Sequence, residues 1–418
     1  MGRLRSLHMR IFHLADLHLG KSIYERDLLE DQRHALDAVL DAVMNEAPAC
    51  VVIAGDVFDR SVPTAEAVTL LGGFAAAIKA LDPGIAIVII PGNHDSAARL
   101  AFLAPVLVQA GVHIASDPES CDRPVVIEKA GERARFWLLP FLTPGAFHRA
   151  EPVAELPADA QPGLFDGPGL TLRSQADMFA EAMRRIGEAM SRERARDQVR
   201  GRDSGAPAAD VLVCHAFARG GQASESERVF LGAAELVDGT AFDAFDYIAL
   251  GHLHRPQAVG TRGRYPGSIL AYSFSETGGE RGFLSVELSP GSSLAEFRPV
   301  TPLRRMVRLH GSYDRVLSDP ALSVYEKDYV EAVLDDAAAV LNPMEPLRRR
   351  FPDILSLRQA AFEQSDTRGV PGAAGARGTS SITDEFAAFH REVRDRDPDP
   401  VDSALFAELC EEASREAP

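Results

Sequence analysis

Between residues 9 and 115, short aliphatic runs alternate with longer segments whose apolar residues recur every three or four positions. The aliphatic runs predict buried strands in "MRIFHLAD", "ACVVIAGD" and "IAIVIIPGNHD". The longer segments predict helices at residues 27–46, 64–81 and 97–110. Strands separated by helices of this length are typical of βαβ units with a largely parallel sheet, so the first part of the chain is predicted to be α/β.

Strand patterns continue after this region. Residues 124–141 predict a strand pair around a turn at Gly131, and strands resume from Asp210 to about residue 299. The intervening residues 144–210 are rich in Pro, Gly and Ala, except for one amphipathic helix after a capping box of Ser174 and Asp177. Its apolar stripe consists of Met178, Phe179, Ala182, Met183, Ile186 and Met190. We expect this stripe to pack on the sheet rather than to bind a cofactor.

The chain is expected to have five parts. Residues 1–8 are an N-terminal extension, residues 9–300 form the main domain, and residues 301–362 form a small α/β domain. Residues 363–381 have the composition of a flexible linker. Residues 382–418 predict two short amphipathic helices, one with Phe386, Phe389 and Val393 and the other with Leu405, Phe406 and Leu409. Helices this short cannot form a core of their own, so their apolar faces are expected to bind a partner.

Composition limits the class of protein. Of the 418 residues, 46% are hydrophobic and 25% are charged, which is typical of a globular protein with a large core. The four cysteines show no C-x-x-C spacing, so neither a zinc ribbon nor a disulfide framework is indicated. No apolar run approaches the ~20 residues that cross a bilayer, and the first residues lack the apolar core of a signal peptide. These observations predict a cytoplasmic protein without a membrane partner.

The net charge of −17 argues against strong nucleic-acid binding by this chain alone, because phosphate contacts normally come from Lys and Arg. Part of that charge lies in residues 382–418, which contain eleven acidic and four basic residues. We therefore expect weak DNA binding by the isolated chain, with a partner subunit supplying much of the basic surface.

Five predicted strands end on residues that commonly bind metals. In chain order these residues are Asp16 and His18; Asp56 and Asp59; Asn93, His94 and Asp95; His215; and His252 and His254. In open α/β sheets the carboxyl ends of strands form the ligand-binding edge, so these side chains are expected to converge. Taken singly, Asp56 reads more readily as a helix cap and His252 as a core histidine. Because such residues follow each of five apolar runs, a metal centre is the favoured interpretation.

The types of side chain indicate the chemistry. Carboxylates, imidazoles and one carboxamide, without a thiolate, favour Mn²⁺ or Fe²⁺ and are compatible with Zn²⁺. There are more candidate ligands than one ion needs. Two ions about 3.5–4 Å apart require a carboxylate between them, and such pairs activate water and bind phosphoryl oxygens during in-line displacement.

The order D-x-H, G-D-x-x-D, G-N-H-D, H and G-H-x-H, over roughly residues 10–256, resembles the signature of the calcineurin-like metallophosphoesterases. This resemblance implies a four-layer αββα sandwich. Further stretches are similar to the SbcD family, the nuclease subunit of the bacterial SbcCD exonuclease. They are "HLADLHLG", "AGDVFDRSVP", "PGNHDS", "YIALGHLHRPQ" and "YPGSILAYSFSE".

The resemblance implies specific roles for these residues. The first metal would be held by Asp16, His18, Asp56 and His254, and the second by Asp56, Asn93, His215 and His252, with Asp56 as the bridge. His94 and Asp59 are the candidate catalytic residues. His94 would face the scissile phosphate and stabilise charge or protonate the leaving 3′ oxygen. Asp59, a histidine in eukaryotic relatives, would either tune His94 or end the turn, and Asp95 would cap the following helix.

The function implied by the resemblance is a dinuclear, manganese-dependent DNA nuclease. It would act as a double-strand exonuclease and a single-strand or hairpin endonuclease in DNA repair, recombination and replication. It would work with an SbcC-like coiled-coil ATPase bound by residues 382–418, as a homodimer within a heterotetramer, and residues 301–362 would cap the DNA. Helices at residues 65–79 and 97–110 carry enough Leu, Val and Phe to pair the two copies, although packing on the sheet explains the same residues more simply. The alternatives are a phosphatase or small-molecule phosphodiesterase of the same superfamily, and an inactive scaffold for the ATPase.

Overall fold

The computed structural model describes residues 8–143, 145–149, 170–171, 174–200, 207–222, 236–237 and 239–360, together with 398, 399, 403 and 406. The chain divides into two compact units. One comprises residues 1–308, 321–331 and 348–356, and the other residues 309–320, 332–347 and 357–418. The predicted linker, almost all of the predicted C-terminal helices and residues 1–7 lie outside the described residues.

The first large sheet has six strands in the order β18-β17-β1-β4-β5-β6. The strands β1 (Met9–Leu14), β4 (Cys50–Ala54), β5 (Ala86–Ile90) and β6 (Val112–Ile114) are parallel, as the βαβ pattern predicts. The strands β17 (Gly282–Ser289) and β18 (Ser292–Pro299) extend this sheet in antiparallel register next to β1. The sheet is therefore mixed, and its two antiparallel strands come from the far end of the domain.

The helices that connect the parallel strands are α1 (Leu29–Glu46) and α2 (Ala65–Leu81). Thr64 caps α2 by accepting a hydrogen bond from the Ala67 amide. The single helix predicted at residues 97–110 is wrong, because the chain forms α3 (Ala97–Leu100), α4 (Ala104–Leu107) and the 3₁₀ turn η1 (Val108–Ala110). Leu103 adopts a left-handed φ of 63°, and Pro105 follows in the first turn of α4, where a proline is tolerated.

The second large sheet also has six strands, in the order β15-β16-β14-β11-β8-β7. Their bounds are β7 (Val125–Lys129), β8 (Glu132–Leu139), β11 (Ala209–His215), β14 (Tyr247–Gly251), β15 (Gln257–Val259) and β16 (Gly263–Tyr265). The predicted strand pair around Gly131 is confirmed as the β7–β8 hairpin, with positive φ at Ala130 and Gly131 as a tight hairpin turn requires. The strands β8, β11, β14 and β16 run parallel, and β7 and β15 run antiparallel at the edges.

The amphipathic helix α5 (Gln175–Arg200) begins as predicted, with the Ser174 hydroxyl accepting a hydrogen bond from the Asp177 amide at 3.0 Å. Its residues Met178, Phe179, Ala182, Ile186 and Met190 are buried in a cluster with Trp137 and Leu212 of the second sheet. Packing on the sheet therefore accounts for this apolar stripe.

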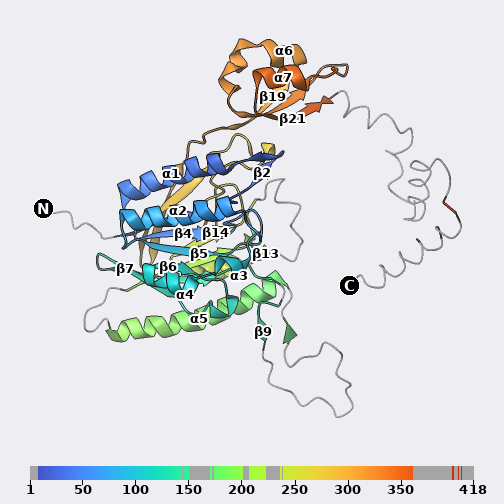
Figure 1. Cartoon of the computed structure of the whole chain (residues 1–418). Coiled ribbons are helices and arrows are strands. Elements are labelled where there is room, and N and C mark those ends of the chain that lie inside the picture. The colour runs from blue at the N-terminus through green and yellow to red at the C-terminus, as the bar shows by residue number, and fades with distance from the viewer. Residues whose placement is uncertain are drawn as a thin grey trace. The chain divides into compact units, whose positions relative to one another are not determined.

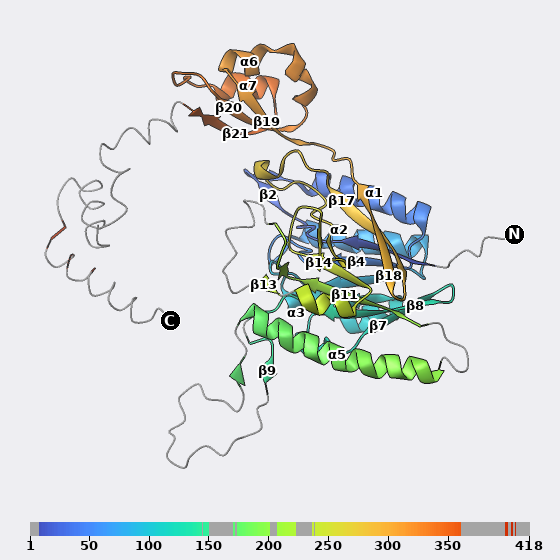
Figure 2. The same ribbon diagram turned by 180° about the vertical axis from the view of Figure 1, so that it is seen from behind.

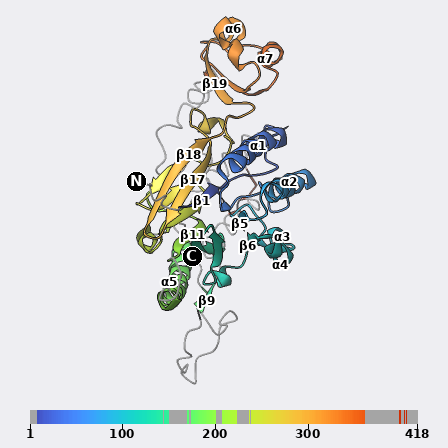
Figure 3. The ribbon, with the colours of Figure 1, turned by 90° about the vertical axis from the view of Figure 1, so that its left-hand side faces the viewer.

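Three hydrophobic cores separate four layers. One core lies between α1, α2 and the first sheet, the second between the two sheets, and the third between the second sheet and α5. Figure 1 shows α1 and α2 on one side of the sheets and α5 on the other, Figure 2 shows the same layers from behind, and Figure 3 shows them from the side. The predicted αββα sandwich is confirmed, and it brings the carboxyl ends of β1, β4, β5, β11 and β14 together.

The remaining elements are short. A three-stranded sheet has the order β19-β20-β21, from β19 (Met306–Gly311), β20 (Tyr329–Leu334) and β21 (Ile354–Gln359). The same part of the chain contains α6 (Tyr313–Ser318), the 3₁₀ helix η7 (Pro320–Tyr325) and α7 (Met344–Arg350). The other short elements are β2 (Ser22–Ile23), β3 (Arg26–Asp27), β9 (His148–Arg149), β10 (Leu170–Thr171), β12 (Phe217–Ala218), β13 (Leu236–Val237), η2 (Pro118–Ser120), η5 (Gly239–Ala244) and η6 (Phe274–Glu276). Among the described helices, none has the length and apolar character to cross a bilayer.

Candidate metal centre

Backbone hydrogen bonds join the loops that follow the central strands. The Asp16 amide donates to the Gly55 carbonyl at 3.1 Å, and the His18 amide donates to the Asp56 carbonyl at 3.0 Å, which ties the loop after β1 to the loop after β4. The His252 amide, after β14 of the other sheet, donates to the Asp16 carboxylate at 3.0 and 3.2 Å. The ends of both sheets are therefore fixed against each other at one place.

The backbone at this place is strained. Asp16, His18, Asp56 and His252 all have a positive φ, at 52°, 42°, 47° and 113°. Residues with a Cβ rarely adopt such angles, and each costs on the order of 1–3 kcal/mol, which the surrounding hydrogen bonds must hold in place. Strain concentrated at four predicted ligands is typical of a functional site.

Two glycines of the sequence motifs allow the close approach of the loops. A Cβ on Gly92 would lie 2.1 Å from the Asp56 Oδ1 atom, and a Cβ on Gly251 would lie 1.8 Å from the Ala54 carbonyl oxygen. Neither contact is possible for a larger residue. The glycines of "PGNHDS" and "YIALGHLH" are thus required by packing around the candidate ligands.

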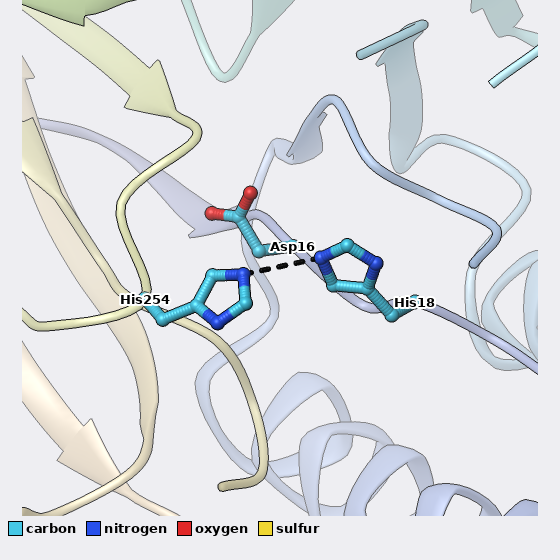
Figure 4. A group of neighbouring side chains, drawn as sticks. All are labelled: Asp16, His18 and His254. Carbon is cyan, nitrogen blue, oxygen red and sulfur yellow. Dashed lines mark hydrogen bonds between the residues drawn. The ribbon is translucent and has the colours of Figure 1, made fainter. Parts of the chain in front are cut away.

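Asp16, His18 and His254 form the first group of candidate ligands. One ligand atom from each lies within 4.8 Å of the others. The Nε2 atoms of His18 and His254 face each other at 3.2 Å (Figure 4). The His254 Nδ1 atom donates to the Glu276 carboxylate at 2.9 Å, so Nε2 is the ring nitrogen that faces His18 and Asp16. Nitrogen atoms this close to Asp16 form a site that suits a cation.

Asn93, His215 and His252 form the second group. The Asn93 Oδ1 atom lies 3.0 Å from His215 Nε2 and 3.1 Å from His252 Nδ1. The His215 Nδ1 atom donates to the Ala54 carbonyl at 2.9 Å, so Nε2 is the ring nitrogen that faces Asn93 and Asp56. An oxygen and two ring nitrogens therefore converge, as a second divalent ion requires.

Asp56 lies between the two groups. Its Oδ2 atom is 3.7 Å from His18 Nε2 and 3.5 Å from His215 Nε2. Its Oδ1 atom accepts a hydrogen bond from the His94 amide at 3.0 Å. One carboxylate thus reaches both groups, which is the position that a bridging ligand would occupy.

Burial and charge set the protonation of these groups. Burial raises the pKa of Asp16 to about 7, although the neighbouring His215 and His254 oppose this shift. Burial also opposes the ionisation of Asp56, but the charge and hydrogen bond of His215 outweigh it and hold the Asp56 pKa well below its usual range. Burial lowers the pKa of His18 to about 4 and of His252 to about 3. These two imidazoles are neutral near pH 7, which is the form that binds a metal.

Asp59 contacts His94 through its backbone rather than its side chain. The His94 Nδ1 atom donates to the Asp59 carbonyl oxygen at 3.0 Å. The Asp59 carboxylate instead accepts a hydrogen bond from Lys21 Nζ at 2.6 Å and lies 3.5 Å from His18 Nδ1. Asp59 therefore orients His94 through its backbone carbonyl oxygen, which any residue at this position would supply.

We expected Asp95 to cap the following helix, but the structure shows that it does not. Its carboxylate accepts hydrogen bonds from the amides of Val57 at 3.0 Å, Phe58 at 2.9 Å and Gly92 at 2.9 Å, and Ser96 caps α3 instead. A carboxylate with three amide donors satisfies buried backbone groups of two loops at once. Asp95 therefore fastens the loop after β4 to the loop after β5.

The structure brings all nine predicted site residues together and adds Glu276 and Lys21, which motif reasoning missed. Glu276 ends the stretch "YPGSILAYSFSE", whose similarity to the SbcD family is a signal that could have identified it. Lys21 follows the first motif directly, and its Nζ atom lies 5.7 Å from the centre of the Tyr272 ring. The ligand and catalytic roles of the nine residues stay predictions.

Comparisons with known proteins identify the family of the chain. The calcineurin-like phosphoesterase family matches residues 9–256. SbcD, a subunit of the nuclease SbcCD, from Staphylococcus epidermidis is 31% identical over 361 residues, which cover 86% of this chain and 87% of that protein. The crystal structure of TT1561 of Thermus thermophilus aligns with 70% of this chain and 99% of its own, at 10% identity and a TM-score of 0.35. The chain therefore belongs to the calcineurin-like phosphoesterases, among the relatives of SbcD, and is a metal-dependent phosphodiesterase.

Proposed function

We propose that this chain is a DNA nuclease that hydrolyses phosphodiester bonds at a centre of two divalent metal ions. The position of the Asp56 carboxylate carries the proposal, because its Oδ2 atom lies within 3.7 Å of one group of candidate ligands and 3.5 Å of the other. A dinuclear centre requires such a shared carboxylate. Asp16, His18, Asp56 and His254 would hold the first ion, and Asp56, Asn93, His215 and His252 the second.

The donor atoms fit this pair of ions. They are carboxylate and amide oxygens and imidazole nitrogens. Cys214, next to His215, is buried, and this burial raises the pKa of its thiol. Oxygen and imidazole donors without thiolate suit Mn²⁺ and Fe²⁺, and the resemblance to the SbcD family favours manganese of the two. When bound, the ions would activate water and neutralise charge on the phosphate.

His94 would act on the phosphate directly. The Asp59 carbonyl holds His94 Nδ1 as a hydrogen-bond donor, and Nε2 is the ring atom that would meet the substrate. With a proton on Nε2, His94 would stabilise the developing charge or protonate the leaving 3′ oxygen. The His94 amide at the Asp56 carboxylate keeps this ring next to the centre.

DNA and an SbcC-like ATPase are the proposed substrate and partner. The similarity to the SbcD subunit of the nuclease SbcCD extends over 86% of this chain and thus well beyond the 9–256 phosphoesterase match. Residues 301–362 would cap the DNA and residues 382–418 would bind the ATPase. Because the net charge is −17, the ATPase would provide much of the basic surface for DNA.

Cleavage assays with the co-purified chain and ATPase test this function. We expect Mn²⁺ and ATP to support degradation of linear duplex DNA and opening of DNA hairpins. A complex that leaves both DNA substrates intact would contradict the proposal. Turnover of phosphopeptides or cyclic nucleotides without DNA cleavage would favour a phosphatase or a small-molecule phosphodiesterase, and ATPase binding without any hydrolysis would favour a scaffold.

We also propose that two copies of this chain pair through a groove between α2 and the α3–α4 segment. The groove has a volume of about 810 Å³ and includes the residues Val62, Val68 and Phe102, which are 62%, 49% and 74% exposed. Exposed apolar residues gathered at one place mark an interaction site, and a symmetric dimer would bury the same patch of both copies. Mass measurement in solution should give twice the chain mass, and Phe102→Asp should give the monomer. A monomeric wild-type chain would contradict the dimer.

A further inference from the structure

His254 is held at both ends by residues from the loop that follows β16. Its ring Nδ1 atom donates to the Glu276 Oε1 atom at 2.9 Å, and its backbone carbonyl accepts a hydrogen bond from Arg281. The Glu276 side chain is completely buried. Burying a carboxylate beside a candidate ligand costs free energy unless the carboxylate has hydrogen-bond partners. The other contacts of Glu276 therefore indicate its role.

Glu276 is itself fixed by donors on its second oxygen. The Tyr272 amide donates to Oε2 at 3.1 Å, and Arg281 Nη2 lies 3.3 Å from the same atom. Arg281 Nη2 also donates to the Glu276 backbone carbonyl at 3.0 Å. These contacts occupy Oε2 and direct Oε1 at His254, so the orientation of the carboxylate determines that of the ring.

We infer that Glu276 is a positioning residue that holds the His254 ring with Nε2 toward Asp16 and His18 and thereby sets the affinity of the first metal site. An ionised carboxylate only accepts hydrogen bonds, so His254 Nδ1 is the donor to Glu276 and Nε2 is the ring nitrogen turned toward Asp16 and His18. That Nε2 atom is 3.2 Å from His18 Nε2. The inference rests on the proposed function, because it takes His254 as a ligand.

The effect is specific to one of the two sites. His215 of the second group has its Nδ1 atom at a neutral acceptor, the Ala54 carbonyl oxygen, at 2.9 Å. A carboxylate behind a ligating histidine orients the ring and makes it more basic, and loss of such a partner typically lowers metal affinity about 10- to 100-fold. Changes at Glu276 therefore act on the first ion and leave the second unchanged.

Manganese titration of the full-length chain tests the inference, with free Mn²⁺ measured by electron paramagnetic resonance. We expect wild type to bind two ions and Glu276→Gln to bind one with wild-type affinity and the other about 10- to 100-fold more weakly. Nuclease activity of the variant should recover as Mn²⁺ is raised. Glu280→Gln is the matched control, because Glu280 belongs to the same loop but is exposed, and it should match wild type.

The possible outcomes separate the inference from the proposed function. A wild-type chain that binds fewer than two ions contradicts the proposed function itself. If wild type and Glu276→Gln both bind two ions with the same affinities, the inference alone is overturned. It is also overturned if the variant loses affinity equally at both sites and its nuclease activity does not recover at high Mn²⁺. If Glu276→Gln does not fold, Glu276→Asp is the second variant. Its shorter side chain keeps the charge but moves it away from His254, so we expect the same selective loss of affinity at the first metal site.

Discussion

The His94 Nδ1 atom lies 3.0 Å from the backbone carbonyl oxygen of Asp59. A carbonyl oxygen can only accept, so His94 donates from Nδ1 and presents Nε2 as its other ring nitrogen. The His94 amide is held at the same time by the Asp56 carboxylate at 3.0 Å. The ring is thus fixed beside the candidate metal centre through its Nδ1 atom and the backbone amide of His94.

We predict that His94→Ala lowers the cleavage rate by about 10²- to 10⁴-fold, the usual contribution of one acid–base group, without changing the number of bound Mn²⁺ ions. Loss of the ring removes the group that would meet the phosphate, but the His94 amide and Asp56 remain. Single-turnover cleavage at saturating Mn²⁺ and metal titration measure the two quantities. Unchanged cleavage would remove His94 from the mechanism, and loss of a metal ion would make it a ligand.

Asp59→Ala should have a different effect from His94→Ala. The substituted residue keeps the carbonyl that orients His94, whereas it loses the carboxylate that lies 3.5 Å from His18 Nδ1 and 2.6 Å from Lys21 Nζ. We expect weaker binding of the first Mn²⁺ ion but less than a tenfold loss of rate at saturating Mn²⁺. Lys21→Met is the control that removes the cation and keeps the carboxylate near His18. A loss with Asp59→Ala as large as that of His94→Ala would show that the carboxylate acts in catalysis.

The sequence allowed prediction of those site residues that directly follow apolar runs. Asp16 and Asp56 fall at the ends of buried strands, and the topology of an α/β sheet brings such ends together. Glu276 was missed because it contacts His254 across 22 residues, through a loop whose path no periodicity encodes. The roles of the Asp59 carbonyl and of Asp95 were missed because hydrogen bonds between loops depend on tertiary structure.

The same distinction holds for the fold. Helices α1 and α2 and the parallel strands β1, β4 and β5 followed from local periodicity, whereas the short parallel strand β6 was not predicted. The pairing of β17 beside β1 did not, because an alternating pattern defines a strand but not its neighbour. The break between α3 and α4 depends on the left-handed φ of Leu103, a residue type that gives no warning of such a conformation.

Gly92→Ala should disrupt both metal sites. The added Cβ would lie 2.1 Å from Asp56 Oδ1, so the carboxylate between the two groups of ligands must move. We expect loss of measurable binding of two Mn²⁺ ions and a stability loss of about 1–3 kcal/mol, as overpacking usually costs. Calorimetric Mn²⁺ titration and urea unfolding measure these effects.

Gly73→Ala is the matched control for that substitution. Gly73 is exposed within α2, and no atom lies within 4 Å of the position that a Cβ would take. Alanine in an exposed helix should raise the free energy of unfolding by about 0.5–1 kcal/mol and leave metal binding unchanged. A Gly92→Ala variant that binds two ions as tightly as Gly73→Ala would show that the loop after β5 can move to accommodate the Cβ without loss of metal affinity.

His13, buried between the two sheets, should make stability depend on pH. Burial lowers its pKa to about 3 in the folded state, whereas the unfolded chain has the ordinary value of about 6.5. Between these values the unfolded state binds a proton that the folded state excludes. The free energy of unfolding therefore falls as the pH falls from about 6.5 to about 3, by up to about 1.4 kcal/mol per pH unit from this residue.

His13→Asn removes this titration and should reduce the slope of unfolding free energy against pH by up to about 1.4 kcal/mol per unit in that window. Its control is Tyr247→Phe, which removes the hydroxyl 2.9 Å from His13 Nδ1 but keeps the imidazole, and it should retain the slope. Trp137, the single tryptophan of the chain, is buried in the core and reports urea unfolding by its fluorescence. Equal slopes for wild type and His13→Asn would mean that His13 is protonated to the same extent in both states, and other buried groups would then have to account for acid unfolding.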